Sequence, residues 1–514
     1  MTEETDASCS SNVEWNRRQV VLGATGTGFA ALMNMPLAVP ATEKRPRLIH
    51  DENSREGSTD WQLTNVAIDP ATRYRSRKIE GYCSRTSLQA GETLKIMVST
   101  NPVSRFQIDV FRLGYYGGKG GRWMKSFGPL EGTTQPDPPV GEYRLRECQW
   151  NSSVEFTIPA DWTSGVYVGK LTAEEGNWQS YVIWIVRDNR ECDFLFQCAD
   201  STWVAYNRWP DQFSLYDDGQ KEWYIGPDVQ VSFDRPYGKY CQVIDNPLFT
   251  GSGSFMLWEF PLVFWMEKEG YDVSYISTVD THADANGLLR TKGFLSVGHD
   301  EYWSREMYDH VMTAIQSGVS VGFLSSDTCW GLIPFLSGQS GQSHRVITRL
   351  GQFGPLDPDA VKAYPELSRF REFGPTEANM IGARNVYPYS GGADWICRAE
   401  DHWLFEGTGM RNGDGIPGLV GFEWMGAPAE IPGLEIVASG QIRLGKIERE
   451  YTATIYPGPK GNVVFNASTI WWADGLSSPP GYKTPSAHGA TPKGPDRRVQ
   501  QITANLFRRI RDGV

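Results

Sequence analysis

Short runs of alternating hydrophobic and polar residues fill the chain between about residues 61 and 188. In a β-strand, side chains two residues apart share one face, so this pattern predicts strands with one buried side. Turn-forming residues separate the runs, and many short strands of this kind are typical of an immunoglobulin-like β-sandwich. The predicted strands are 93–99, 106–112, 153–158, 165–171 and 180–186.

The pattern changes from about residue 189, where short hydrophobic runs alternate with longer segments of helical periodicity. Alternating strands and helices predict a parallel, doubly wound sheet. The expected fold class is therefore α/β with a β-sandwich, in which the sandwich occupies 61–188 and an α/β domain occupies 189–514. The main predicted strands are 193–197, 271–276, 294–297, 319–324 and 461–466, and the helices are 256–269, 305–317 and 495–512.

The amino-terminal segment has the features of an export signal. Residues 16–22 (NRRQVVL) have the twin-arginine form, and a weakly hydrophobic run follows them. Val39 and Ala41 fit the small-residue rule for signal cleavage. We predict a twin-arginine (Tat) signal peptide at 1–41, a linker at 42–60, and a mature protein that is periplasmic or secreted.

The same segment has an alternative interpretation, a glycine-rich dinucleotide turn at 20–28. Such a turn must be followed by a helix, and Met35-Pro36 interrupts it. The signal peptide is therefore favoured. No other apolar run is long enough to span a bilayer, so we predict no membrane span.

Composition limits the partners. The 49 basic and 61 acidic residues give a net charge of −12, which argues against nucleic acid as a partner. The 19 tryptophans indicate either flat ligand-contact surfaces or an aromatic-rich core. The 8 cysteines form no CxxC metal pair, and both the disulfides of an exported protein and buried thiols fit their spacing.

Candidate chemistry lies in residues 293–303 (GFLSVGHDEYW), which read as a buried strand that ends near a glycine. His299 and Glu301 are two apart and are expected on the same side of the extended chain. In open α/β sheets, ligands bind at the carboxyl ends of strands. One imidazole nitrogen beside one carboxylate oxygen suits zinc, iron or manganese. The alternative is a hydrogen-bonded loop histidine beside a solvated carboxylate.

Six motifs, distributed over most of residues 105–475, carry a family resemblance. They are RLGYYGG (112–118), TWVAYN (202–207), SFDRPY (232–237), EGYDV (269–273), SVGHDEYW (296–303) and PGLVGFEW (417–424). Through these motifs the chain resembles the large (beta) subunit of N,N-dimethylformamidase and its relatives.

This resemblance implies a β-sandwich followed by a glutamine-amidotransferase-like α/β domain. It also implies one iron, ferric by preference and with zinc as the alternative, held by a tyrosine, a histidine and a glutamate. His299 and Glu301 match the histidine and glutamate. Tyr206 and Tyr237 both lie in matching motifs, and either one fits the tyrosine. The family works with a separate small subunit, so we expect such a partner or a homo-oligomer.

Two further acidic residues are candidates for catalysis. Asp327 follows the strand after His299, where relatives tend to carry an asparagine that orients the substrate. An ionised aspartate only accepts hydrogen bonds, so it cannot donate to a carbonyl. Glu423 matches an acidic position of the family, and among aromatic neighbours it fits a general base.

Three functions remain open. The first is an exported metal-dependent hydrolase of a C–N bond, amide- or formamide-like, in a small-molecule substrate. The second is a non-haem iron oxygenase, which needs a second histidine beside His299 and Glu301. The third is an exported binding protein without catalysis. The candidates for the second histidine are His310, His344, His402 and His488.

Overall fold

The computed structural model describes residues 47–239, 246–485 and 491–513. The predicted signal peptide, part of the linker and His488 lie outside these residues, as do Cys9 and Cys241. The described part is a mixed α/β structure built from several sheets, which confirms the broad prediction. The immunoglobulin-like and amidotransferase-like assignments stay predictions.

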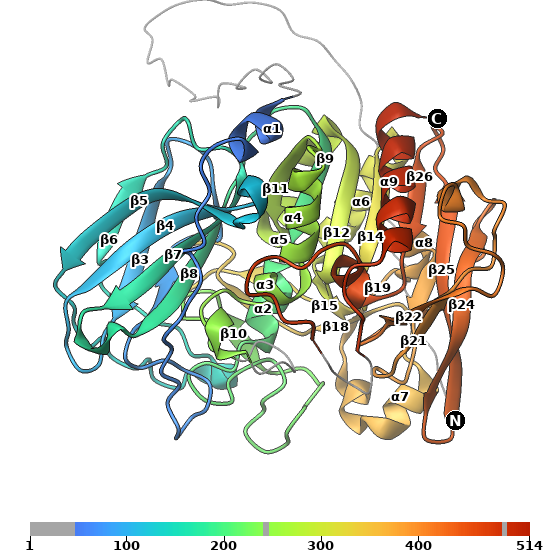
Figure 1. The fold of residues 1–514 in the computed structure, drawn as a ribbon. Helices are drawn as coiled ribbons and strands as arrows, with labels where there is room; N and C mark the ends of the chain where they lie inside the picture. The colour runs from blue at the N-terminus through green and yellow to red at the C-terminus, as the bar shows by residue number, and fades with distance from the viewer. Residues whose placement is uncertain (1–46, 240–245, 486–490, 514) are drawn as a thin grey trace, which may run out of the picture. The chain divides into compact units, whose positions relative to one another are not determined.

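The alternating region forms two sheets that face each other (Figure 1). Inward side chains of both sheets, such as Ile96, Ile108 and Trp184, make one hydrophobic core. Alternation therefore produced a sandwich because every second side chain is buried between the sheets. One sheet has the order β2 (Ser87–Leu88), β8 (Gln179–Val186), β7 (Gly165–Ala173), β4 (Phe106–Leu113), β5 (Gly121–Leu130); the other is β1 (Glu80–Cys83), β3 (Thr93–Ser99), β6 (Val154–Thr157).

A seven-stranded sheet forms the centre of the remaining chain. Its first five strands are parallel and have the order 2-1-3-4-5, with β9 and β12 adjacent where the order reverses. In doubly wound sheets, ligands bind at the carboxyl ends of the strands at such a reversal. The full order is β11 (Val273–Ser277), β9 (Cys192–Cys198), β12 (Thr291–His299), β14 (Ser320–Ser326), β26 (Val463–Asn466), β25 (Ile447–Pro457), β24 (Glu435–Leu444).

The sequence pattern predicted the bounds of one helix of the α/β part correctly and merged two others into one. The helix α6 (Arg305–Ser317) has the predicted bounds, because the Ser304 side chain caps its start and Gly318 ends it in a left-handed conformation. The predicted helix 256–269 is divided into α3 (Phe255–Trp258) and α4 (Phe260–Lys268). Pro261 lies in the first turn of α4 and has no N–H to continue a helix from α3. No helix among the described residues is long and apolar enough to cross a membrane.

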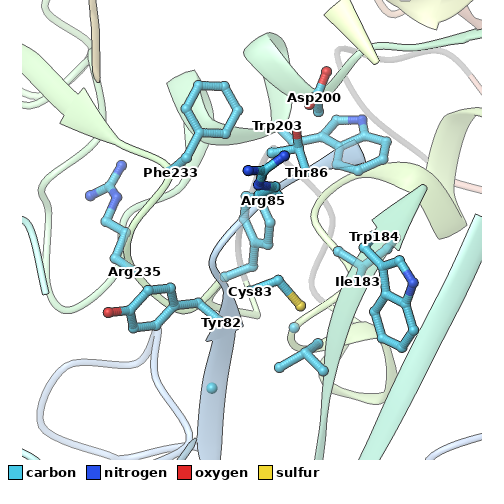
Figure 2. Close-up of a pocket in the computed structure, with 14 residues that line it drawn as sticks. Tyr82, Cys83, Arg85, Thr86, Ile183, Trp184, Asp200, Trp203, Phe233 and Arg235 are labelled. Atoms are coloured by element: carbon cyan, nitrogen blue, oxygen red, sulfur yellow. The ribbon is translucent and has the colours of Figure 1, made fainter. Parts of the chain in front are cut away.

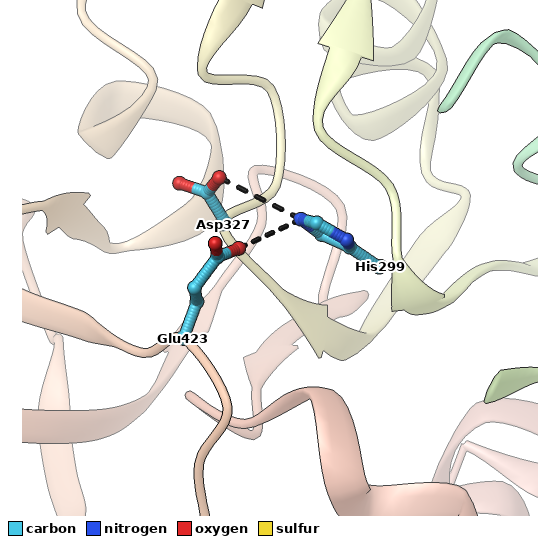
Figure 3. Close-up of side chains that lie close together, drawn as sticks. All are labelled: His299, Asp327 and Glu423. Carbon is cyan, nitrogen blue, oxygen red and sulfur yellow. Dashed lines mark ion pairs between the residues drawn. The ribbon is translucent and has the colours of Figure 1, made fainter. Parts of the chain in front are cut away.

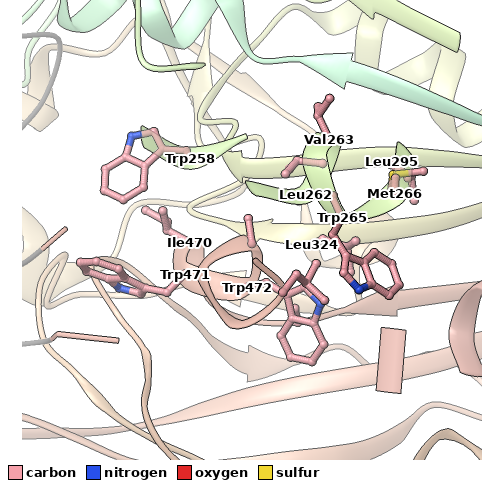
Figure 4. Close-up of a cluster of buried hydrophobic side chains, with 14 of the residues drawn as sticks. Trp258, Leu262, Val263, Trp265, Met266, Leu295, Leu324, Ile470, Trp471 and Trp472 are labelled. Atoms are coloured by element: carbon pink, nitrogen blue, oxygen red, sulfur yellow. The ribbon is translucent and has the colours of Figure 1, made fainter. Parts of the chain in front are cut away.

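Aromatic and aliphatic side chains fill the space between α4 and the sheet (Figure 4). Trp258, Leu295 and Leu324 pack there with Trp471 and Trp472 from the segment after β26. The amphipathic helix α9 (Arg497–Asp512) closes the same core through residues such as Leu506 and Phe507. Much of the tryptophan content is thus core.

Short elements surround the carboxyl end of the central sheet. They include α2 (Asp200–Tyr206), α5 (Thr278–Ala283) and α7 (Pro358–Ala363). Four small sheets are formed by β10 (Gln230–Ser232), β16 (Phe335–Leu336) and β17 (Val346–Thr348); β13 (Tyr302–Trp303), β15 (Gly331–Leu332), β18 (Gly351–Phe353) and β19 (Glu372–Gly374); β20 (Ala383–Asn385) and β23 (Met425–Pro428); and β21 (Ala393–Ile396) and β22 (Gly415–Val420). Of the other short helices, α1 (Leu48–Asn53) packs against α4, and α8 (Ala378–Ile381) packs against β20 and β26.

The six described cysteines are free thiols, and all six are buried. Cys83 and Cys148, which lie within the sandwich sequence, are among them. For the described cysteines, the interpretation as buried thiols is therefore confirmed and that as disulfides is wrong.

A buried ion pair joins the sandwich to the α/β part. Arg112 of β4 donates through two nitrogens to both carboxylate oxygens of Glu267 in α4, at 2.9 and 2.7 Å, and both side chains are fully buried. Tyr275 and Asn53 also donate to this carboxylate. A buried pair of this kind requires both partners, because either charge alone is left without compensation.

We therefore expect Glu267→Ala to lower the free energy of unfolding by about 3–5 kcal/mol, since it leaves a buried guanidinium unpaired. The double variant Arg112→Met/Glu267→Leu removes both charges and is expected to lose less. Urea unfolding measures both values. A double variant that is at least as destabilised as Glu267→Ala would show that packing, and not charge pairing, holds this junction.

Candidate functional site

Three neighbouring segments place His299, Asp327 and Glu423 at the carboxyl edge of the central sheet. His299 is the last residue of β12 and pairs with Ser326, the last residue of β14. Asp327 follows directly, so the registers of the two strands bring these side chains to one level. Glu423 lies between β22 and β23, in a loop tied by backbone hydrogen bonds to the segment after β26.

The backbone around His299 has a specific local cause. Gly298 has φ +68°, and a Cβ at this position would lie 2.5 Å from the Cβ of Trp258. Glycine therefore allows β12 to approach α3 and turn at its end. Asp327 also has a positive φ, +48°, a conformation that aspartate tolerates better than most residues. Both sharp turns direct side chains into the space above the sheet.

His299, Asp327 and Glu423 form a tight buried cluster (Figure 3). The Nε2 atom of His299 lies 2.7 Å from Oε2 of Glu423 and 3.7 Å from Oδ2 of Asp327. The predicted partner Glu301 is also close, with Oε2 at 3.4 Å from the same nitrogen. Three carboxylates thus converge on one imidazole nitrogen.

Two tyrosines hold Glu301 in place. The hydroxyl of Tyr206 donates to Oε2 (2.7 Å) and that of Tyr216 donates to Oε1 (2.8 Å). Tyr206 is the last residue of α2, and Thr202 in the same helix accepts the backbone N–H of Glu301 at 3.0 Å. The helix after β9 therefore positions both the carboxylate and a phenol beside His299, whose ring centroid is 5.3 Å from that of Tyr206.

A chain of hydroxyl groups continues from Tyr216 to a buried arginine. Tyr302 donates to the Tyr216 hydroxyl at 2.7 Å, and Arg349 donates to Tyr302. The Arg349 guanidinium also lies 4.7 Å from the Tyr216 ring centroid and 5.7 Å from that of Trp330. Arg349 thus supports the tyrosines from behind and does not reach the carboxylates directly.

Burial dominates the electrostatics of the cluster. It raises the pKa of Asp327 well above the usual value, and the neighbouring charges of Glu423 and Glu301 raise it further. Burial, with the charge of Glu301, raises the pKa of Glu423 in the same way. Burial and Glu301 also raise the pKa of Tyr206, so its phenol keeps its proton when no cation is near.

The cluster lies at the base of a cavity of about 420 Å³, which we call the aromatic cavity. No basic side chain is among the described residues that line it. Its eleven lining residues are Tyr206, Tyr216, Trp223, Ile225, Glu301, Asp327, Trp330, Tyr364, Tyr389, Phe422 and Glu423.

Tyr237, the other tyrosine predicted as a ligand, lies elsewhere. It lines a small cavity of about 20 Å³ beside strand residues of the sandwich such as Tyr82 and Trp184 (Figure 2). Its ring packs against Trp203 at a centroid distance of 6.4 Å. Of the two predicted tyrosines, the structure brings Tyr206 to Glu301 and His299 and gives Tyr237 a place in packing.

The histidines considered for an oxygenase are also placed apart from the cluster. His310 contacts the backbone carbonyl of Thr281, and His344 packs against His282. His402 packs on Trp403. Across the described ranges, the one group of candidate metal ligands contains a single histidine. His488 lies outside them.

The residues that sequence patterns did not identify are Tyr216, Arg349, Tyr364 and Tyr389. Tyr216 and Arg349 are far from the His-x-Glu motif in sequence and belong to no motif of their own. Tyr302, which bonds to Tyr216, directly follows Glu301, so the His-x-Glu motif itself pointed to it. Tyr216, Arg349, Tyr364 and Tyr389 reach the site through loops whose course is set by tertiary packing.

The donor set suits a metal ion. Nε2 of His299 and Oε2 of Glu423 are buried 2.7 Å apart but form no hydrogen bond with each other or with another described residue, and Nδ1 of His299 is also buried without a described hydrogen-bond partner. A cation between imidazole and carboxylates would satisfy Nε2 and Oε2 and offset the crowded negative charge. Nδ1 lacks the outer hydrogen bond that histidine ligands usually donate. The cluster could therefore bind a metal, whose identity the donors do not fix.

These pKa shifts predict how the stability of the metal-free protein depends on pH. The unfolded carboxyls lose protons near 3.8 and 4.5, whereas folded Asp327 and Glu423 keep theirs to higher pH. Their contribution to stability is thus present below pH 4 and is lost as pH rises through the folded pKa. We expect a slope of about 1.4 kcal/mol per pH unit for each such carboxyl, and a smaller slope in Asp327→Asn and Glu423→Gln.

Urea unfolding with a chelator at pH 5, 6, 7 and 8 measures this slope. Asp309→Asn, an exposed substitution on α6, is the matched control and is expected to leave the slope unchanged. Equal slopes in the wild type and in both site variants would contradict the raised pKa values.

Comparison with known proteins gives a family assignment. A family model described as "N,N-dimethylformamidase beta subunit-like, C-terminal" matches residues 107–486, well over half of the chain. No curated protein matches the chain. A solved family 123 glycoside hydrolase from Clostridium perfringens shares 10% identity over 55% of this chain and 50% of that chain, with a TM-score of 0.11 that supports no inference. Because the family match spans both the sandwich and the α/β part, the chain belongs to the N,N-dimethylformamidase beta subunit-like family.

Proposed function

We propose that this protein is a metal-dependent hydrolase that cleaves the C–N bond of an amide. The observation that carries the proposal is the convergence of Glu301, Asp327 and Glu423 on Nε2 of His299 at the base of a cavity. Membership of the dimethylformamidase-like family supports the reaction class. The proposal includes iron as the metal, with zinc as the alternative, and export through the twin-arginine pathway.

The four groups divide into two kinds. Glu301 accepts a hydrogen bond on each oxygen, which fixes the orientation of its carboxyl group. It is therefore suited, with His299 and the phenol of Tyr206, to hold the cation. Burial raises the pKa values of Asp327 and Glu423, which favours their protonated forms. They are therefore suited to acid–base roles.

A bound metal ion supplies Lewis-acid polarisation of the amide carbonyl and a more acidic water. Glu423, in its ionised form, takes a proton from the attacking water as the water oxygen bonds to the acyl carbon. The same carboxyl then returns that proton to the leaving nitrogen as the C–N bond breaks, which gives a carboxylic acid and an amine. The aromatic rings around the base exclude bulk water from this exchange.

The raised pKa of Asp327 suggests how an aspartate can act at a position where relatives tend to carry an asparagine that donates a hydrogen bond. A protonated carboxyl has an O–H donor, which an ionised one lacks. Protonated Asp327 can therefore donate to the substrate carbonyl, as the asparagine of relatives is expected to do. A raised pKa favours the protonated form, in which this carboxyl is a donor as well as an acceptor.

The metal is tested by elemental analysis of purified wild type and His299→Ala. We expect about one ion per chain in the wild type and a loss of at least tenfold in affinity in the variant, since Nε2 is the one nitrogen donor of the cluster. His310→Ala is the matched control and is expected to keep the ion. Equal metal content in the wild type and His299→Ala would overturn the proposed site, and loss in His310→Ala would favour the two-histidine oxygenase.

The role of Glu423 is tested by Glu423→Gln, which keeps the shape of the side chain and removes its proton exchange. We expect kcat for amide hydrolysis, followed by amine release, to fall by about 10²–10⁴-fold, while the metal content stays near that of the wild type. An unchanged kcat would remove Glu423 as the base. Loss of the ion together with activity would instead assign Glu423 to the metal. Purified, metal-loaded wild type that releases no amine from any amide tested would leave the binding-protein alternative.

A further inference from the structure

The aromatic rings that line the walls of the aromatic cavity indicate which kind of ligand it can bind. Two continuous groups of rings run from the buried end to the half-buried rim. In one, the Tyr206 and Tyr216 ring centroids are 4.5 Å apart, and those of Tyr216 and Trp223 are 5.8 Å apart. In the other, the centroids of Trp330 and Tyr389 are 5.8 Å apart, and those of Tyr389 and Tyr364 are 6.2 Å apart. Six of the eleven lining residues belong to these groups.

Ring groups of this kind favour flat, apolar ligands. Aromatic side chains stack or meet edge to face with other rings, and they gain more from a ring than from a methyl group. Tyr364 and Tyr389 are half-buried and form the outer part of the lining. Tyr206, Tyr216 and Trp330 are buried and form the inner part.

The volume also exceeds the needs of a very small amide. Cavities of about 300–1,000 Å³ typically bind drug-sized ligands, and this cavity has about 420 Å³. An amide with two methyl groups would contact only the base and leave the two ring groups exposed to water. The family name therefore does not by itself give the size of the substrate.

Charge excludes one class of ligand. The described lining contains three carboxyl groups and no lysine, arginine or histidine. Arg349 lies behind the rings of Tyr216 and Trp330 and is not among the lining residues. A carboxylate on the substrate, away from the amide, would have no cationic side chain to pair with and would lose its hydration. A cationic group meets favourable ring faces instead.

We infer that the substrate is an amide with an aromatic ring and no negative charge, bound with its amide group at the carboxylate cluster and its ring between the two aromatic groups of the cavity. This inference rests on the proposed function for the reaction and on the cavity alone for the ligand class.

The test compares N-methylformamide with N-benzylformamide and N-methylphenylacetamide, which carry the ring on the nitrogen side and on the acyl side. Binding is measured by quenching of tryptophan fluorescence, because Trp223 and Trp330 line the cavity, and turnover is measured by amine release. We expect at least one ring-bearing amide to have a Kd and a KM lower than those of N-methylformamide by about tenfold or more. Addition of a carboxylate to the ring of that amide is expected to weaken binding by about tenfold, and a trimethylammonium group is expected not to.

Two results overturn the inference. One is that N-methylformamide binds or reacts as well as both ring-bearing amides, in which case the proposed hydrolase stands and its substrate is small. The other is that the carboxylate analogue binds as well as its parent. If ring-bearing amides bind as expected but no amide is hydrolysed, the proposed function fails and the ligand class stands.

A variant pair locates the ring. Tyr389→Ala is expected to raise the Kd of the tighter-binding ring-bearing amide by about fivefold or more, since it removes the residue that links Trp330 to Tyr364. Phe373→Ala, an aromatic residue of β19 that is 50% exposed and outside the cavity, is the matched control. Tyr364→Leu serves as a second variant if circular dichroism shows that Tyr389→Ala is misfolded. A folded Tyr389→Ala or Tyr364→Leu protein with unchanged Kd would contradict this placement of the ring.

Discussion

Crowding of carboxyl groups in a buried pocket is the constraint on which the site depends. Glu301, Asp327 and Glu423 all approach one nitrogen of His299, and no described lysine or arginine lines the same space. Negative charges in such surroundings must be neutralised by protons or by a cation. The raised pKa values of Asp327 and Glu423 are the proton-bound solution, and a metal ion is the other. The crowding of negative charge therefore accounts for both proton exchange and metal binding in the proposed chemistry.

The rest of the α/β structure serves to maintain this crowding. The paired ends of β12 and β14 fix His299 and Asp327 at one level, and the segment after β26 ties down the Glu423 loop. On the other side of β12, the helix that follows β9 brings Tyr206 to Glu301. The donors come from three connections: His299 and Glu301 from the end of β12, Asp327 from the end of β14, and Glu423 from the loop between β22 and β23. Loss of any one connection would relax the cluster. Sites of this kind trade stability for function, because the groups that make them reactive are costly to bury.

A chain of hydrogen-bond donors distinguishes Glu301 from Asp327 and Glu423. Arg349, Tyr302 and Tyr216 form a chain of donors that ends on this carboxylate, while Asp327 and Glu423 face the cavity. A carboxylate held by two phenols has a fixed orientation, which suits a ligand that must meet a cation at a set angle. The two less constrained acids retain the freedom to exchange protons with a substrate. One type of side chain thus serves two roles through its neighbours.

The sequence by itself determined the broad α/β fold class, the main strands and helices of both parts, and the placement of His299, Glu301 and Asp327 at the carboxyl ends of neighbouring strands. These follow from local rules: alternation marks one buried face, Ser304 and Gly318 bound α6, and parallel strands end at a common edge. Only the tertiary structure decided that Tyr206 and not Tyr237 reaches the cluster, that α3 and α4 are separate, and that Tyr216 and Arg349 support Glu301. It also assembled the aromatic cavity from loops far apart in the chain. These features depend on the packing of distant segments, and no periodicity or short motif encodes which loop lies against which. For the same reason the sequence pattern located the acids but could not show their burial, which is what changes their protonation and hence what they can do.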